Sequence, residues 1–434
     1  IKNNLLIMKV SELMSRKEII LLARKIIVMA KKEQFRTITF RADDFKEMNL
    51  TQSDISLGEL AKIMAVNFEM ANFEFDRYKN KKTFRVRKII IHGNSALDSS
   101  FLKGFSKGRI VGEWTNYARA LINEPGSKMT PKAFSRDARK AAIKAGLKCT
   151  VKTALAKFGG VTAVGKGSVN TPRFIILEHN GGAKGEKPVV LVGKGVTYDS
   201  GGQDLKSAAG MLDMQMDMSG GAAVIAALAI AAKLKLKKNI VGLIPAVENM
   251  LSDKSYRPND IITMLSGKTV EVENTDAEGR IILADALTYA AENYNPQLIV
   301  DIATLTGAAL YVAGEKYSVY LTNAQKLENI VKMIGKKSGD LMWPLPLEKE
   351  YEKELEGRFA DLSNMGKSKC GTVTAALFLY QFVKEAKIPW LHIDMAPTML
   401  AYSGDYLAKG SSGAPIRFLV ELLEKEMLPL LEVE

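Results

Sequence analysis

The chain has 434 residues, more than one ordinary hydrophobic core supports, so its length predicts two domains. Hydrophobic residues make up 47% and charged residues 25%, which is typical of a soluble globular protein, and no apolar run is long enough to cross a bilayer. The two cysteines and three scattered histidines exclude a disulfide framework and zinc sites built on Cys and His clusters. We therefore expect a cytoplasmic protein without membrane contact, in which carboxylates hold any metal ion.

Residues 1–98 are predicted to form a small N-terminal α/β domain, because helix-like and strand-like patterns alternate along them. These patterns fall on Glu18–Lys32 (helix), Phe35–Phe40 (strand), Leu57–Met70 (helix) and Thr83–His92 (strand).

The same part of the chain is rich in basic residues, with 19 Lys and Arg against 12 Asp and Glu in residues 1–100. The run Arg77–Lys88 alone holds seven basic and two aromatic residues. Such a run could follow a nucleic-acid backbone, so a DNA contact through this domain is one interpretation. A charged hairpin or protected edge strand with solvated side chains is the other, and the pattern leaves both open.

A helical pattern over Leu102–Leu121 predicts a connecting helix within residues 99–125, and Thr130-Pro131 then opens a new helix. Residues 126–434 are predicted to form a larger α/β domain, because strand and helix patterns alternate along them. Continuously apolar strands such as Val189–Val192 indicate a mainly parallel sheet sandwiched by helices. In such sheets, ligands bind at the carboxyl ends of the strands.

Two stretches of this larger domain carry the chemistry. Asn274–Arg280 is interpreted as an extended loop whose alternate residues Asp276, Glu278 and Arg280 point to one side. The glycine-rich segment Gly193–Gly202 directly follows a strand. This segment and the residues after it supply two lysines and two more acids: Lys194, Asp199, Lys206 and Asp217. Four acids crowded together repel unless cations neutralise them, and two divalent ions about 3.5–4 Å apart would do so.

Both stretches resemble the signatures of the leucine aminopeptidase (cytosol aminopeptidase) family. The resemblance continues through Asn123-Glu124-Pro125, Asp301–Ala308 and Lys409–Gly413, in the family's order, and covers most of residues 120–425. It implies that residues 126–434 are the catalytic domain of a dinuclear-metal leucyl aminopeptidase, a hydrolase. Such an enzyme releases N-terminal residues, preferentially Leu or Met, from peptides with a free N-terminus. The family also implies a homohexamer.

The resemblance implies a role for each matching residue. Asp199 and Glu278 would bridge the two metal ions, Asp276 would complete the exchangeable site, and Lys194 and Asp217 would complete the tighter one. The ions would be Mn²⁺ or Zn²⁺, with Co²⁺ or Mg²⁺ as alternatives in the exchangeable site. A lysine binds metal only as the neutral amine, so Lys194 would need its pKa lowered by the adjacent ions.

Two further residues are implied to be catalytic, and four to bind substrate. Lys206 would stabilise the oxyanion, and Arg280 would hold a bicarbonate ion that serves as general base. Similarity to the family's first side-chain pocket points to Met214, Thr304, Gly307 and Ala396, although Met214 also suits plain core packing.

Several residues depart from the family pattern without removing a ligand: Gln203, Asp204, Ser207 and Pro397. We expect them to alter loop shape and substrate preference. A different two-metal hydrolase, such as a phosphoesterase, is the competing interpretation. Lys194 disfavours it, because phosphoesterase sites prefer His and carboxylate ligands.

Overall fold

A computed structural model describes residues 14–41, 55–92 and 99–425. The chain divides into two compact units. The first comprises residues up to Asn116 together with Ser403–Ala408, and the second comprises Tyr117–Tyr402 and the residues from Lys409 onward. Within the described ranges, no helix is both long and apolar enough to cross a membrane.

The first unit combines helices with a two-stranded parallel sheet, which confirms the predicted small α/β fold. Its elements are α1 (Arg16–Lys32), β1 (Thr37–Arg41), α3 (Leu57–Asn72), β2 (Lys88–His92) and most of α4 (Ser99–Ile122). The strand predicted from Thr83 begins only at Lys88. The residues before it form a loop, in which the backbone amide of Thr83 and the side chain of Arg85 donate to Asp76 and Lys82 donates to the carbonyl of Arg77.

Helices α3 and α4 pack closely through glycines. A Cβ at Gly104 would lie 1.9 Å from the carbonyl oxygen of Gly58, and one at Gly108 would lie 2.4 Å from that of Lys62. The two helix backbones therefore approach more closely than any larger residue at these positions allows.

The second unit is built on a nine-stranded sheet. Its strands, in sequence order, are β3 (Lys148–Lys152), β4 (Arg173–Asn180), β5 (Val189–Gly193), β6 (Gly195–Asp199), β7 (Asn239–Asn249), β10 (Leu298–Ala303), β11 (Ser318–Thr322), β12 (Met342–Pro344) and β14 (Trp390–Asp394). The central strands β14, β10, β5 and β7 are parallel, whereas β4 and β11 pair antiparallel to their central neighbours. A mainly parallel sheet is thus confirmed.

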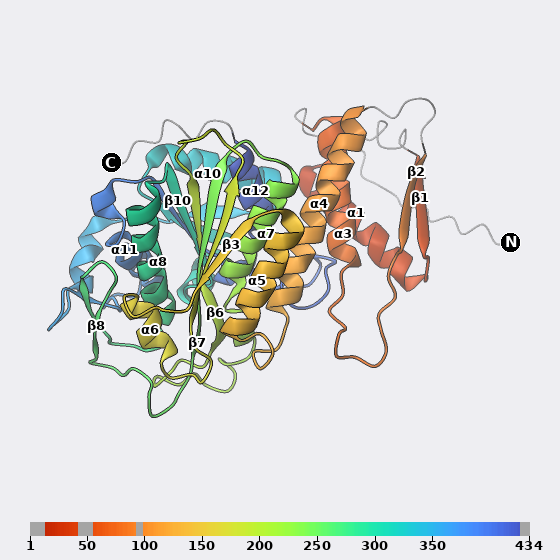
Figure 1. Ribbon diagram of the computed structural model, residues 1–434. Coiled ribbons are helices and arrows are strands. Elements are labelled where there is room, and N and C mark those ends of the chain that lie inside the picture. The colour runs from red at the N-terminus through yellow and green to blue at the C-terminus, as the bar shows by residue number, and fades with distance from the viewer. Residues whose placement is uncertain (1–13, 42–54, 93–98, 426–434) are drawn as a thin grey trace. The chain divides into compact units, whose positions relative to one another are not determined.

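Helices cover both faces of this sheet, as predicted (Figure 1). On one face lie α5 (Pro131–Ala145), α7 (Ser219–Lys233), α10 (Gln325–Ser338) and α12 (Ile416–Glu424). On the other lie α6 (Gly159–Gly165), α8 (Glu278–Tyr294) and α11 (Gly371–Tyr380). A small separate sheet contains β8 (Ile261–Thr263), β9 (Thr269–Glu271) and β13 (Leu362–Ser363). The central strands are fully buried because helices pack against each face, which explains their continuous apolar sequences.

Candidate metal centre

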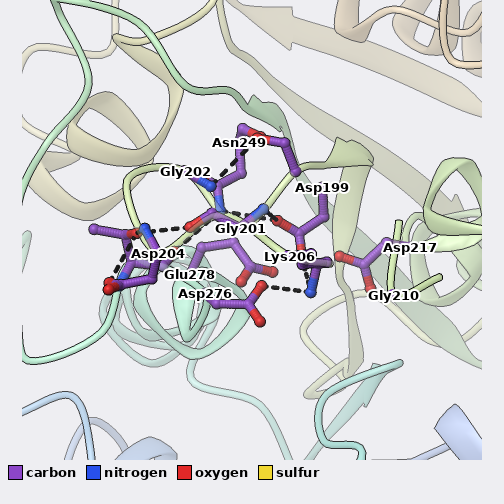
Figure 2. A network of polar contacts seen from close by, with 12 residues as sticks. Asp199, Gly201, Gly202, Asp204, Lys206, Gly210, Asp217, Asn249, Asp276 and Glu278 are labelled. Atoms are coloured by element: carbon purple, nitrogen blue, oxygen red, sulfur yellow. Dashed lines mark hydrogen bonds and ion pairs between the residues drawn. The ribbon is translucent and has the colours of Figure 1, made fainter. Parts of the chain in front are cut away.

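The charged residues of the second unit converge where β5 and β6 end and α7 and α8 begin (Figure 2). Lys194 joins β5 to β6, and Asp199 is the last residue of β6. Asp217 lies two residues before α7, and Glu278 is the first residue of α8. The site therefore forms at the carboxyl ends of parallel strands, where the sequence predicted it.

The stretch Asn274–Arg280 is not the extended loop that the sequence suggested. Asp276 lies in a turn, whereas Glu278 and Arg280 belong to the first turn of α8. Two positions along a helix rotate a side chain by about 200°, so Glu278 and Arg280 do not share a face. The turn, rather than an alternating pattern, brings Asp276 and Glu278 together.

Lys194 is completely enclosed by acids and backbone. Its Nζ lies 2.9 Å from Asp217 Oδ2 and 2.8 Å from Glu278 Oε1, and donates to the carbonyl of Thr304 at 3.0 Å. Burial by itself would lower the pKa of Lys194, but Asp217 and Glu278 outweigh it and raise this pKa above its usual value. A Cβ at Gly279 would lie 2.7 Å from Nζ, so the glycine between Glu278 and Arg280 makes room for this lysine.

Lys206 bridges the other pair of acids. Its Nζ lies 2.8 Å from Asp199 Oδ2 and also forms an ion pair with Asp276 Oδ1. Burial opposes its charge, but Asp199 and Glu278 raise the pKa of Lys206, so the side chain stays protonated. The two lysines thus divide the four acids between them.

The four carboxylates nevertheless exceed the two lysines that face them. One carboxylate oxygen from each of Asp199, Asp276 and Glu278 lies within 4.8 Å of the others, a spacing suited to shared metal ligands. Burial, followed by repulsion from Asp199, raises the pKa of Asp276 to about 7 and also raises that of Glu278. Asp217 Oδ2 and Glu278 Oε1 both contact Lys194 Nζ, and Asp276 Oδ1 shares Lys206 Nζ with Asp199, so each ammonium is divided between two carboxylates. Divalent cations can balance the negative charge that the lysines leave over.

Arg280 stands apart from this cluster. Its Nη1 donates to the carbonyl of Asn364 at 2.9 Å, and no described residue accepts a hydrogen bond from its Nε. Burial lowers the pKa of Arg280 to about 10, against the attraction of Glu278 and Asp394, so the guanidinium remains charged at neutral pH. A buried cation with a donor to spare suits a bound anion.

The four residues assigned to the substrate pocket lie on three neighbouring segments. Met214 begins the short helix η1 (Met214–Met216), Thr304 and Gly307 follow β10, and Ala396 begins η4 (Ala396–Thr398). Met214 is only half-buried, which argues against plain core packing. A Cβ at Gly307 would meet nothing within 4 Å, so there is open space beside it.

Sequence reasoning missed the residues that hold these segments in place. Asp394, the last residue of β14, accepts hydrogen bonds from the backbone amides of Leu305, Thr306 and Ala396. Asn249, the last residue of β7, donates to Asp199 Oδ1 at 2.9 Å and to the carbonyl of Thr275 at 3.0 Å. A polar residue at the end of a buried strand was the available signal for both.

Three of the four residues that depart from the family pattern lie in the segment between Asp199 and Asp217, on either side of Lys206. Gln203 Nε2 donates to the carbonyl of Ser252 at 3.2 Å, and Ser207 Oγ accepts from the backbone of Gly210 at 3.1 Å. Asp204 bonds to Thr275 at the start of the ligand-bearing turn. Pro397 is buried within η4.

The basic run of the first unit folds around an acid. Arg85 Nη2 lies 2.8 Å from Asp76 Oδ1, and Lys82 donates to the carbonyls of Asp76 and Arg77. Burial raises the pKa of Asp76, but the hydrogen bonds from Arg85 and Thr83 outweigh it and keep this pKa below its usual value. Part of the run is therefore structural.

Comparison with known proteins agrees with this geometry. Residues 116–420 match the model of the cytosol aminopeptidase family, catalytic domain. A probable cytosol aminopeptidase of Syntrophotalea carbinolica is 41% identical, over 86% of this chain and 76% of its own. One of Bdellovibrio bacteriovorus is 42% identical, over 87% and 77%. A solved structure, the bottromycin maturation enzyme BotP in complex with Mn, superposes with a TM-score of 0.85 at 31% identity, covering 94% of this chain and 87% of its own. The chain belongs to the cytosol aminopeptidase family, whose members are metal-dependent aminopeptidases.

Proposed function

We propose that this protein is a dinuclear-metal leucyl aminopeptidase that releases N-terminal Leu or Met from peptides with a free N-terminus. The observation that carries the proposal is the excess of buried acid: four carboxylates face only Lys194 and Lys206. Two ammonium groups can balance only two of four negative charges, so the site calls for additional positive charge.

The resemblance to the family implies the ligand set, and the convergence of oxygens from Asp199, Asp276 and Glu278 supports it. Asp199 and Glu278 would bridge the two ions, Asp276 would complete one site, and Lys194 and Asp217 would complete the other. Two bound divalent ions would lower the pKa of a shared water, polarise the scissile carbonyl and offer a position for a free α-amine. Lys194 would act as the neutral amine, because added cations reverse the effect of the acids that raise its pKa.

The remaining polar residues would orient the substrate and stabilise charge. Lys206 stays protonated beside Asp199 and Asp276, so its ammonium can stabilise an oxyanion. The spare donor of Arg280 would hold a bicarbonate ion, whose oxygens can accept the proton of the attacking water.

We propose that the pocket lined by Met214, Thr304, Gly307 and Ala396 sets the preference for Leu and Met. The open space beside Gly307 and the half-buried side chain of Met214 support this assignment, because apolar side chains of moderate size, such as those of Leu and Met, fit such surroundings.

The location of the protein, the identity of its metal ions and its oligomeric state are also proposals. We propose a cytoplasmic homohexamer loaded with Mn²⁺ or Zn²⁺, with Co²⁺ or Mg²⁺ able to enter the exchangeable site. The relatives named cytosol aminopeptidases and the Mn complex of BotP support these choices. Sedimentation equilibrium should give six times the chain mass of 47.6 kDa.

The deciding experiment removes metal with a chelator and then restores Mn²⁺, Zn²⁺ or Co²⁺ separately. Hydrolysis is followed with Leu-amide, Met-amide and Asp-amide, and with N-acetyl-Leu-amide as the blocked control. We expect metal-dependent cleavage of Leu-amide and Met-amide only.

Equal cleavage of the acetylated substrate would contradict the role of the free amine. Faster cleavage of Asp-amide would contradict the assigned pocket. Cleavage of a phosphomonoester without cleavage of any amide would instead select the competing phosphoesterase function.

Nucleic-acid binding by the first unit remains a separate prediction. Lys79, Lys81 and Arg87 are exposed, and Tyr78 is 56% exposed beside them, so the loop could present both charge and a stacking surface. The variant Lys81→Gln/Arg87→Gln spares Lys82 and Arg85, which hold the loop. DNA affinity that falls steeply with salt and is lost in this variant would support a contact, and no salt-sensitive binding would eliminate it.

A further inference from the structure

The glycine-rich ligand loop and the turn before α8 are joined by a pair of residues that are not ligands. We propose that Asp204 and Thr275 form a clasp that sets the distance between Asp199 and Asp276, and with it the affinity for the more exchangeable ion. The proposal rests on the two-metal function above. It assigns Asp204, one of the departures from the family pattern, a positioning role.

The clasp is reciprocal. Asp204 Oδ2 accepts from the backbone amide of Thr275 at 2.7 Å, and the backbone amide of Asp204 donates to Thr275 Oγ1 at 2.8 Å. The same hydroxyl lies 2.6 Å from the carbonyl of Gly201, to which it donates. Figure 2 shows Asp204 on the opposite side of the site from Asp217, with Gly201 between Asp204 and Asp199.

Each half of the clasp lies close in sequence to a ligand. Thr275 is fully buried and immediately precedes Asp276, and Gly201 lies two residues after Asp199. The amide of Gly201 also donates to Asp199 Oδ1 at 2.9 Å. Bonds between Thr275 and this loop therefore fix the backbone on both sides of the Asp199–Asp276 pair.

Close packing makes the clasp stiff. A Cβ at Gly201 would lie 2.4 Å from the carbonyl oxygen of Asp204, and one at Gly202 would lie 2.8 Å from Asn249 Oδ1. Asn249 contributes a third point of attachment through its bonds to Asp199 and Thr275. A displaced Asp204 would thus move the loop that carries Asp199, rather than only its own side chain.

Asp204 is otherwise an exposed residue, and an exposed acid is usually a solvated one. Two observations separate it from that case. Its carboxylate accepts a hydrogen bond from the backbone amide of Thr275, which is 71 residues away in sequence. The backbone amide of Asp204 donates a second hydrogen bond to the hydroxyl of the same threonine. Residues that support metal ligands in this way typically change metal affinity by about 10–100-fold when they are replaced.

The test is a Mn²⁺ titration of the metal-free full-length protein, with free Mn²⁺ measured by electron paramagnetic resonance. Wild-type protein should bind two ions. Asp204→Ala should weaken the weaker-bound ion by about 10–100-fold and the tighter one by less, because Thr275 directly precedes Asp276, which completes only the weaker site. Asp204→Asn keeps an oxygen that can accept from Thr275, so its affinity should stay within about threefold of wild type.

Gln203→Ala is the matched control, because Gln203 lies in the same loop but bonds to Ser252 instead. Unchanged binding of both ions in Asp204→Ala would overturn the clasp, as would equal weakening of both ions with a lower melting temperature of the metal-free protein. A wild-type protein that does not bind two ions would contradict the proposed function instead.

Discussion

The first unit and the metal centre of the second unit both place carboxylates beside basic side chains, in different proportions. In the first unit, Glu59 faces both Arg16, at 2.7 Å, and Lys62, at 2.8 Å. In the metal centre, four carboxylates share Lys194 and Lys206. In the first case bases outnumber the acid, and in the second case acids outnumber the bases.

This difference distinguishes charged residues that stabilise the fold from charged residues that can bind a ligand. A matched pair holds two elements together and needs nothing more, whereas an excess of buried acid is unfavourable until another cation binds. The basic run Arg77–Lys88 illustrates the first case, since Arg85 and Lys82 close a loop around Asp76. A dense run of charge in the sequence is therefore a weaker sign of chemistry than a few acids that the fold buries together.

Removing the proposed bridging acid should have the largest effect. Glu278→Ala leaves the two ions without a shared ligand, so activity should fall by about a thousandfold or more, equivalent to roughly 4 kcal/mol of transition-state stabilisation. Mass spectrometry measures the metal content, and hydrolysis of Leu-amide measures the activity. Glu273→Ala, an exposed acid in the preceding segment, is the control. Full metal content and activity in Glu278→Ala would show that Glu278 does not bridge the ions.

Arg280→Ala should have a smaller effect, because Arg280 stands outside the carboxylate cluster. We expect both ions to remain bound and the rate to fall by about a hundredfold, with the loss of any stimulation by added bicarbonate. Steady-state kinetics with and without bicarbonate check this. A variant that is inactive while both ions are bound would indicate that Arg280 does more than hold an anion.

The stability of the first unit should depend on close packing between its helices rather than on bound metal. Gly104→Ala places a Cβ against the carbonyl of Gly58, so we expect a loss of about 3 kcal/mol in the free energy of unfolding of this unit. Urea titration combined with hydrogen exchange of α3 measures it, and Ser106→Ala, an exposed neighbour on α4, is the control. Equal stability of both variants would show that the two helices separate easily.

Glu69 on α3 is an acid of the first unit that does not follow this pattern of pairing with bases. Burial, followed by repulsion from Glu113 and opposed by Arg109, raises the pKa of Glu69 to about 7. Because the folded state holds this proton more tightly than the unfolded state, the free energy of unfolding should fall as pH rises from about 4.5 to about 7, and should then level off.

Replacement of this acid should remove that pH dependence, which is the smallest effect we expect. Glu69→Gln should raise the free energy of unfolding by about 1 to 3 kcal/mol at neutral pH and leave it nearly unchanged at pH 4. Urea titrations at the two pH values measure the difference. The same change at both pH values would show that Glu69 is not protonated in the folded protein.

The sequence by itself was enough to predict helices and strands and to identify the residues that supply the chemistry. The predicted segments Leu57–Met70 and Val189–Val192 lie within α3 and β5, because apolar periodicity is set by short-range backbone geometry and by which faces are buried. The motifs around Lys194 and Glu278 likewise named the family correctly, since each motif lies within a few consecutive residues.

The tertiary structure alone decided how those residues meet. An alternating pattern suggested that Asp276, Glu278 and Arg280 share a face, but the start of α8 turns Arg280 away toward Asn364. The bond between Asp204 and Thr275 joins residues that are 71 positions apart, and periodicity carries no information about such a pair. Local patterns encode backbone conformation, whereas the balance of charge within the site depends on which distant segments the sheet brings together.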